Sequence, residues 1–235
     1  NKLTNLGLEG RNLKLLEESV RRPYGMILIT RPTGSGKSTT LYAILQILNQ
    51  ESYNIVSLED PVEYYITVVN QSQIRPEIEY TFATGLRSIL RQDPDIIMVG
   101  EIRDKETAEL AVHSALTGHL VLSTLHTNNA IGVIPRLIDM GVDPFLIPPT
   151  LILAIGQRLV RTLCKDSKKK VKLTGKIKEI ITKEIESMPP SLRDSLTGGM
   201  QQEIYQAEVS PTCPKGTRGR TAIFEILAMT PELEK

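Results

Sequence analysis

The sequence predicts an α/β protein built on a mostly parallel, doubly wound sheet. Short and nearly continuous apolar runs alternate with helix-like segments along roughly the first 160 residues. Such runs are typical of strands buried on both faces, and the helices between them supply the crossover connections of a parallel sheet. With 235 residues, 40% of them apolar, the chain is long enough for one large domain and a smaller appendage.

The elements follow one another in a regular order. Each expected strand is a run of four apolar or small residues, and each expected helix carries apolar residues at helical spacing. The first strand leads through a Gly-rich segment into a helix, which favours a ligand site at that turn. The expected strands are 26–29, 55–58, 96–99 and 120–123, and the expected helices are 37–49, 83–91, 104–116 and one opening at 128–129.

The character of the chain changes after about residue 161. Seven lysines crowd 165–178, followed by a Pro-Pro pair at 189–190 and a Gly-Gly pair at 198–199. We expect a core over 1–160 and a small subdomain over 161–235, with a lysine-rich linker between them and a closing strand at 222–227. A solvated face is the favoured interpretation of the lysines, and contact with anionic lipid or an acidic partner is the alternative.

Composition excludes several classes of protein. The net charge of +1, the 4% aromatic content and the lack of tryptophan argue against direct nucleic-acid binding. Cys164 and Cys213 are too few for a disulfide framework, which favours a reducing compartment. No apolar run reaches the roughly 18 residues of a spanning helix. Because the chain starts at Asn1 and stops soon after a strand, we expect a fragment of a longer protein.

Residues 33–38 resemble a phosphate-binding loop. Small residues allow consecutive backbone N–H groups to converge on phosphate oxygens, while Lys37 would reach the β- and γ-phosphates and Ser38 would bind Mg²⁺. Arg31 stands where the pattern G-x-x-x-x-G-K-[ST] has its first glycine, which is a departure from the pattern. The candidate nucleotide-binding residues are Thr33, Gly34, Ser35, Gly36, Lys37, Ser38 and Thr39.

Acidic residues follow two of the expected strands. Glu59, Asp60 and Glu63 close the second strand, and Glu101 follows the third after Gly100. The carboxyl ends of parallel strands face the ligand crevice, so one of these carboxylates would polarise the attacking water and others would hold Mg²⁺. A solvated acidic turn is the alternative for the first group. The candidate metal ligands are Ser38, Glu59, Asp60 and Glu101.

Basic side chains supply further candidates. His119 and His126 flank the fourth strand and would converge on a phosphate or a carboxylate if the chain turns after Thr124. Arg87 and Arg91 are four residues apart and share a helix face, where they would bind phosphate, meet another subunit or pair with nearby acids. The candidate catalytic residues are Glu63, Arg87, Arg91, Glu101, His119 and His126.

Several ordered motifs resemble those of the secretion ATPase superfamily, in particular its type IV pilus assembly and type II secretion members. These motifs correspond to its Walker A, Asp box, Walker B and His box, together with a segment rich in arginine. The resemblance is dense over 5–163 and thinner over 213–227. The segments that carry it are 33–40, 57–63, 86–95, 99–104, 117–127, 137–142 and 157–159.

This resemblance implies a RecA-like P-loop core and an ATP-hydrolysing ring motor, usually a hexamer. The motor would act in the cytoplasm, at the inner face of the membrane, and drive pilus assembly or type II secretion through an inner-membrane platform protein. Glu63 would be the catalytic acid–base group, Glu101 would support Mg²⁺ and water, and His119 and His126 would sense the γ-phosphate or couple subunits.

The resemblance has consequences for rate and metal content. Family members carry an N-terminal domain that supplies arginines and is missing here, so we expect slow turnover. The family's Cys₄ zinc site is half lost, with Ser167 and Gly216 in place of two cysteines, and we expect no zinc. One alternative is a nucleotide-binding structural or regulatory module that barely hydrolyses ATP because of Arg31. A DNA-moving motor is less favoured on charge.

Overall fold

The computed structural model describes residues 2–30, 37–50, 52–188, 190, 193 and 203–234. The chain divides into two compact units, of which unit 1 comprises Asn1–Leu159 with Ala222–Lys235 and unit 2 comprises Val160–Thr221. The sequence-based expectation assigns all of 161–235 to one subdomain. The structure instead places Ala222–Lys235 in unit 1, because its last strand forms an edge of the main sheet.

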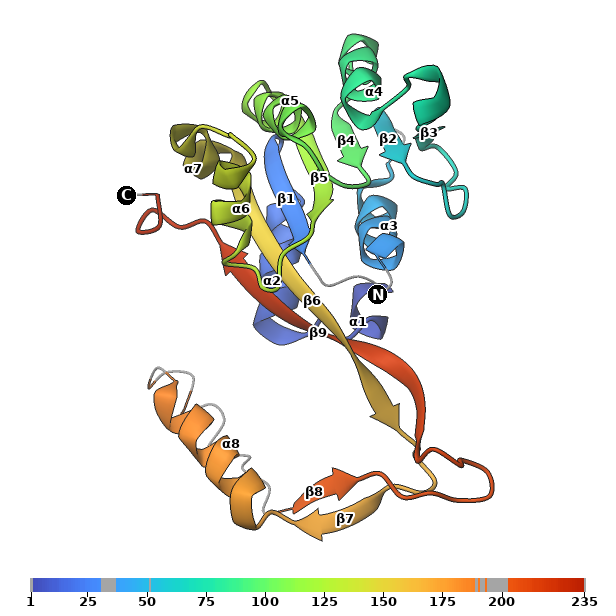
Figure 1. The fold of residues 1–235 in the computed structure, drawn as a ribbon, viewed down its shortest axis with the longest axis vertical. Helices are drawn as coiled ribbons and strands as arrows, with labels where there is room; N and C mark the ends of the chain where they lie inside the picture. Colours follow the sequence, from blue (N-terminus) through green and yellow to red (C-terminus); the bar gives the residue numbers. More distant parts are fainter. Residues whose placement is uncertain are drawn as a thin grey trace. The chain divides into compact units, whose positions relative to one another are not determined.

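A seven-stranded sheet forms the centre of unit 1, with the order β3-β2-β4-β5-β1-β6-β9 (Figure 1). Every neighbouring pair from β3 to β6 is parallel. The arrow of β9 runs opposite to that of β6 (Figure 1). The prediction of a mostly parallel sheet is therefore confirmed. The strands are β1 (Gly25–Thr30), β2 (Ile55–Glu59), β3 (Asn70–Gln73), β4 (Ile96–Val99), β5 (Leu120–Leu125), β6 (Leu151–Leu163) and β9 (Thr217–Ala228).

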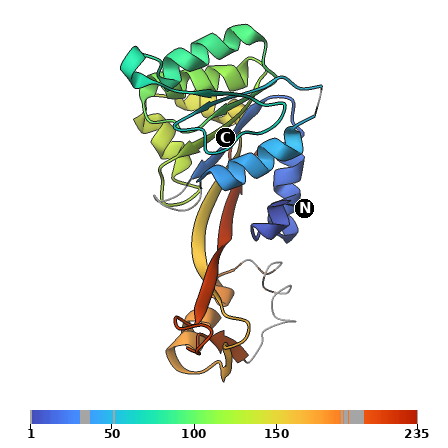
Figure 2. The ribbon, with the colours of Figure 1, turned by 90° about the vertical axis from the view of Figure 1, so that its right-hand side faces the viewer.

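Helices cover both faces of this sheet, as Figure 2 shows for α3 and the green helices on opposite sides. Alternate residues of β1 explain the two layers. Met26 and Leu28 belong to one buried cluster, and Ile27 and Ile29 belong to the other. One face carries α1 (Lys2–Asn5), α2 (Gly10–Ser19) and α3 (Lys37–Leu48), and the other carries α4 (Phe82–Ile89), α5 (Lys105–Leu116), α6 (Val133–Asp139) and α7 (Ile147–Thr150).

Two elements differ from the sequence-based expectation. The helix after β5 begins at Val133 rather than at 128–129, because the Asn129 side chain accepts a hydrogen bond from the Gly132 N–H at 2.9 Å and closes a turn there. The apolar run before residue 157 supplies the beginning of β6, a strand that the expected strands leave out. Short 3₁₀ helices complete the unit at Pro76–Ile78, Leu90–Gln92 and Pro144–Leu146.

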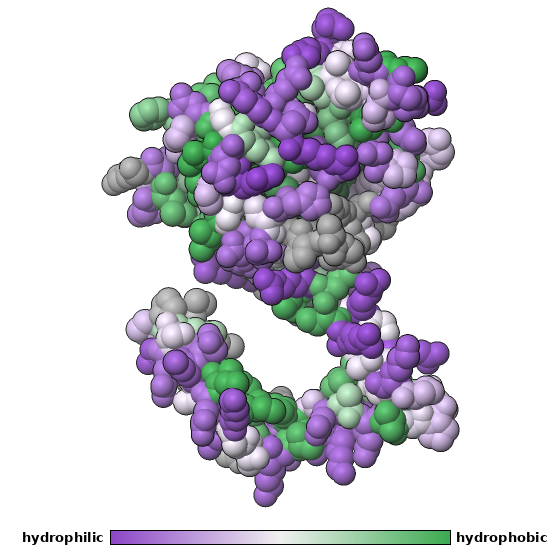
Figure 3. Space-filling model, in the orientation of Figure 1, coloured by the Kyte–Doolittle hydropathy of each residue, from purple (hydrophilic) through white to green (hydrophobic). Residues whose placement is uncertain are grey.

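Unit 2 contains an antiparallel pair, β7 (Lys169–Lys172) with β8 (Glu203–Gln206), and α8 (Gly175–Ser187). Cys164 and Cys213 form a disulfide in this unit, a pairing that the sequence did not predict. Apolar side chains on α8 face solvent (Figure 3), with Ile177 and Ile180 each more than half exposed. No helix in the described part of the chain is both long and apolar enough to cross a membrane.

Candidate functional site

The site lies at the carboxyl edge of the sheet, where β1, β2 and β4 end and α3 begins. The loop candidates Thr33, Gly34, Ser35 and Gly36 fall outside the described residues, as do Arg31 and the side chains of Lys37 and Ser38. The backbone of Lys37 opens α3. Thr39 is exposed on its first turn, where it lines a cavity of about 310 Å³ with Asn5, Leu6 and Tyr64.

A second cavity of about 260 Å³ opens between the ends of β2 and β4. Its lining combines four carboxylates with one guanidinium. The topology explains this composition, because β2 and β4 are parallel neighbours and their following residues emerge side by side. The charged lining residues are Glu59, Asp60, Glu63, Glu101 and Arg103, and the others include Leu41, Tyr42, Pro61, Phe82, Met98 and Gly100.

Glu101 follows β4, and two side chains, those of Arg103 and His126, contact its carboxylate. Its side chain is only 11% exposed, forms an ion pair with Arg103 and accepts a hydrogen bond from the Nε2 atom of His126 at 2.8 Å. The sequence predicted Glu101 and His126 as separate candidates, and the structure brings them into contact. Gly100 allows the ends of β2 and β4 to lie close together, since a Cβ there would lie 3.1 Å from the Leu58 carbonyl oxygen.

Arg103 joins the acids of β2 and β4, and the sequence analysis missed it. Its guanidinium pairs with Glu101 and lies 3.5 Å from Asp60. The hydrogen bond to Glu101 raises the pKa of Arg103 above its ordinary value, so the guanidinium stays charged. The sequence feature that could have indicated Arg103 is its place two residues after Glu101, and this spacing alone is weak evidence for a functional residue.

Glu59 is buried and is held by three donors. The Ser57 hydroxyl and the Gln71 Nε2 group donate to its Oε1 atom at 2.5 and 2.9 Å. The Tyr42 hydroxyl donates to its Oε2 atom. Burial and this hydrogen bond raise the pKa of Tyr42 beyond the ordinary tyrosine range, so the phenol stays protonated. Both oxygens of Glu59 are therefore engaged by side chains of unit 1.

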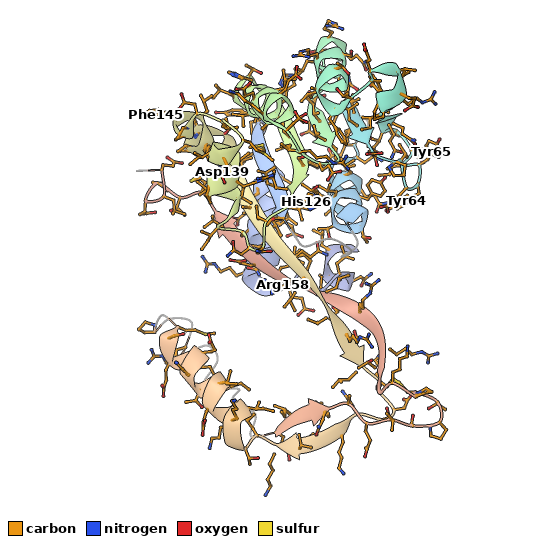
Figure 4. All side chains as sticks on the ribbon, viewed as in Figure 1. Tyr64, Tyr65, His126, Asp139, Phe145 and Arg158 are labelled. Carbon is orange, nitrogen blue, oxygen red and sulfur yellow. A yellow bond between two sulfur atoms is a disulfide. The ribbon has the colours of Figure 1, made fainter. Side chains whose placement is uncertain are left out.

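Glu63 follows β2 on an exposed loop that contacts α3. Its backbone N–H donates to the Tyr42 hydroxyl at 3.2 Å, and its side chain faces the cavity lined by Glu101. The ring of Tyr64 packs edge-on against that of Tyr42, with centroids 4.4 Å apart. Figure 4 labels Tyr64 and Tyr65, which follow Glu63 on this loop. Tyr42 is a second residue that sequence reasoning missed, since one tyrosine in an apolar helix gives no functional signal.

Three predicted residues are not brought to this cavity. The carbonyl of His119 accepts from the N–H of Gly25, the first residue of β1, so His119 lies at the opposite edge of the sheet. Its Nδ1 atom is 2.9 Å from the Ser114 carbonyl oxygen. Arg87 pairs with Glu106 at the start of α5, on the surface of the unit. Arg91 is exposed in the short helix Leu90–Gln92, next to the residues that precede β4.

A family model described as "Type II/IV secretion system protein" matches residues 1–235. The chain belongs to this family. The predicted resemblance is thereby confirmed. Its relatives in this family include the type II secretion system protein E of Pseudomonas aeruginosa, which is 48% identical over 225 residues, covering 96% of this chain and 42% of that protein. The type IV pilus assembly ATPase PilB of Myxococcus xanthus is 47% identical over 226 residues, covering 96% of this chain and 38% of that protein.

Solved structures of secretion and pilus proteins share the fold. The Legionella pneumophila ATPase DotB gives a TM-score of 0.65 at 26% identity, covering all of this chain and 52% of that chain. The pilus retraction motor PilT with bound ADP gives 0.60 at 35% identity, covering 83% and 59%. The predicted RecA-like fold class is confirmed by these likenesses. The chain spans less than half the length of the two curated relatives above.

Proposed function

We propose that this chain is the ATP-hydrolysing portion of a motor for type IV pilus assembly or type II protein secretion. The observation that carries the proposal is the acidic cavity beside the first turns of α3, in which Glu63, Glu101 and Arg103 meet. The relatives support it, because they are named as a pilus assembly ATPase and as type II secretion system proteins. The alternative of a binding module without hydrolysis is not favoured, since Glu63 and Glu101 line one cavity and a relative is named as an ATPase.

In this proposal, different side chains have different roles in phosphoryl transfer. Lys37 would gather charge on the phosphates, and the exposed carboxylate of Glu63 would orient the attacking water and take its proton. Arg103 and His126 hold the buried carboxylate of Glu101 at the cavity wall. Thr39 and Leu6 line the neighbouring cavity, where the nucleoside would lie. His119, Arg87 and Arg91 stay candidates for contacts with other subunits only, because none of them lines these cavities.

The cavity suits Mg²⁺, which prefers oxygen ligands. Asp60 and Glu63 offer exposed carboxylates, and Ser38 remains a candidate ligand. Glu101 would act as a ligand only by exchanging a partner, since Arg103 and His126 bind its two oxygens. Glu59 fits this role poorly, because three donors already bind its oxygens. When bound, Mg²⁺ would neutralise charge on the β- and γ-phosphates. Within the described residues, no group of three or more His, Cys, Asp or Glu side chains is arranged to hold a metal ion.

The same proposal extends to partners and location. A ring of copies, six by the family resemblance, would act through an inner-membrane platform protein at the cytoplasmic face of the membrane. The support is family membership, together with the names of the secretion and pilus relatives.

A calorimetric titration with Mg-ADP tests whether this chain binds nucleotide, with Lys37→Ala as the control. We expect micromolar binding by the chain and none by the variant. ATP turnover is then compared with that of Glu63→Gln, which keeps the side-chain size and removes the base. Binding that survives Lys37→Ala, or turnover that survives Glu63→Gln, would contradict the proposed roles.

A further inference from the structure

We infer that Tyr42 and Glu59 form a positioning pair that sets the place of Glu63 relative to the phosphate-binding helix α3. The inference rests on the proposed function only for what Glu63 does; the positioning itself stands on the geometry. It also reassigns Glu59, which the sequence analysis treated as a metal ligand.

The Tyr42 hydroxyl is the junction between two elements. Tyr42 is fully buried on α3, five residues after Lys37, where its hydroxyl donates to Glu59 and accepts from the Glu63 N–H at 3.2 Å. A phenol has one proton to donate and lone pairs to accept. This single group therefore links the helix that follows the phosphate-binding segment to the end of β2 and to the loop after it.

Glu59 orients the phenol. Glu59 is 4% exposed, and its carboxylate also accepts hydrogen bonds from Ser57 and Gln71. Because a carboxylate can only accept, the Tyr42 hydroxyl must donate its proton to Glu59, and the phenol oxygen then accepts from the Glu63 N–H. A buried carboxylate without such donors would be costly. Three donors account for this carboxylate without a metal ion.

Further side chains hold the loop on either side of Glu63. The Gln71 side chain donates to the Tyr64 carbonyl at 3.2 Å and accepts from the Ile66 N–H at 2.6 Å. The Tyr64 ring then packs against that of Tyr42. Because Gln71 also binds Glu59, the loop is tied to the same carboxylate from two directions. The Glu63 side chain is the part left exposed to the cavity.

The test is Tyr42→Phe, which keeps the buried ring and removes only the hydroxyl. Tyr80→Phe is the matched control, since it removes a hydroxyl bonded to Ser72 at 2.9 Å, and Tyr80 does not line the cavity. Amide hydrogen exchange at Glu63 is measured by NMR in both variants. We expect about tenfold faster exchange in Tyr42→Phe alone, because that amide loses its partner. Unchanged exchange at Glu63 would overturn the inference.

Kinetics supply the second readout. In Tyr42→Phe we expect the turnover number for ATP to fall about ten- to hundredfold with little change in KM, as for a misplaced catalytic group. A loss confined to KM, or an equal loss in Tyr80→Phe, would contradict positioning. If the unmodified chain does not hydrolyse ATP, the proposed function fails, and the exchange measurement alone decides the positioning.

Glu59→Gln separates positioning from metal binding and serves if Tyr42→Phe fails to fold. Its side chain keeps the same size, so we expect a lower turnover number at an unchanged half-saturating Mg²⁺ concentration. An approximately tenfold higher Mg²⁺ requirement would show that Glu59 binds the metal and would refute its role as an anchor.

Discussion

The ion pair between Arg103 and Glu101 contributes to stability because its carboxylate is buried. Replacing Arg103 with Met keeps the aliphatic stem and removes the guanidinium. The Glu101 side chain is 11% exposed, so losing one charged partner leaves an acid that water reaches poorly. His126 still donates at 2.8 Å, which limits the loss. We expect the free energy of unfolding to fall by about 1–3 kcal/mol, the cost of removing a hydrogen-bond partner from a buried acceptor.

Arg87→Met is the matched control. Arg87 also pairs with a glutamate, Glu106, but that carboxylate is 53% exposed. An exposed pair of this kind contributes about 0–1 kcal/mol. Urea unfolding of both variants, followed by circular dichroism at pH 7, measures the difference. Equal losses in the two variants would refute the argument that burial of the acid sets the strength of the pair.

Three further results are expected. Gly100→Ala places a Cβ 3.1 Å from the Leu58 carbonyl oxygen, so β2 and β4 must separate slightly. We expect the free energy of unfolding, measured with urea, to fall by about 1–3 kcal/mol. An unchanged free energy would show that the strand ends move apart without cost. Leu122→Ala leaves a cavity at a fully buried position in the central strand β5. We expect the free energy of unfolding to fall by about 2–5 kcal/mol, and a fall of less than about 1 kcal/mol would contradict tight packing around Leu122. The pKa of Tyr42 is raised by burial, so above about pH 10 the unfolded chain loses its phenolic proton first and stability declines. Urea midpoints at pH 8 and 10.5 should therefore fall less steeply in Tyr42→Phe than in the unmodified chain, and identical slopes would contradict the raised pKa.

The buried strands were predictable because their sequence pattern is local. A parallel sheet covered on both faces requires apolar residues at successive positions, and the runs at 26–29, 55–58, 96–99 and 120–123 all became strands of unit 1. The strand order and the long strand β6 were not predictable in the same way. The apolar residues that open β6 do not reveal which strands of the sheet they will pair with.

Part of the candidate site was also predictable, from the acidic residues that follow the buried strands. Acids placed directly after β2 and β4 meet at one edge whenever those strands are parallel neighbours, and Glu63 and Glu101 line one cavity. His119 shows the limit of motif reasoning. It lies six residues before Leu125, at the start of β5, and the length of that strand separates it from the carboxyl edge.

The sequence by itself determined the fold class, the family and the acids at the strand ends, because each of these depends on residue types at short spacing. The tertiary structure alone decided the partners of those acids. Arg103, which follows β4, reaches Asp60 at the end of β2, and Tyr42 reaches Glu59 from a helix 17 residues away. Such contacts depend on the strand register and the helix packing, which bring side chains together from positions that no local pattern connects.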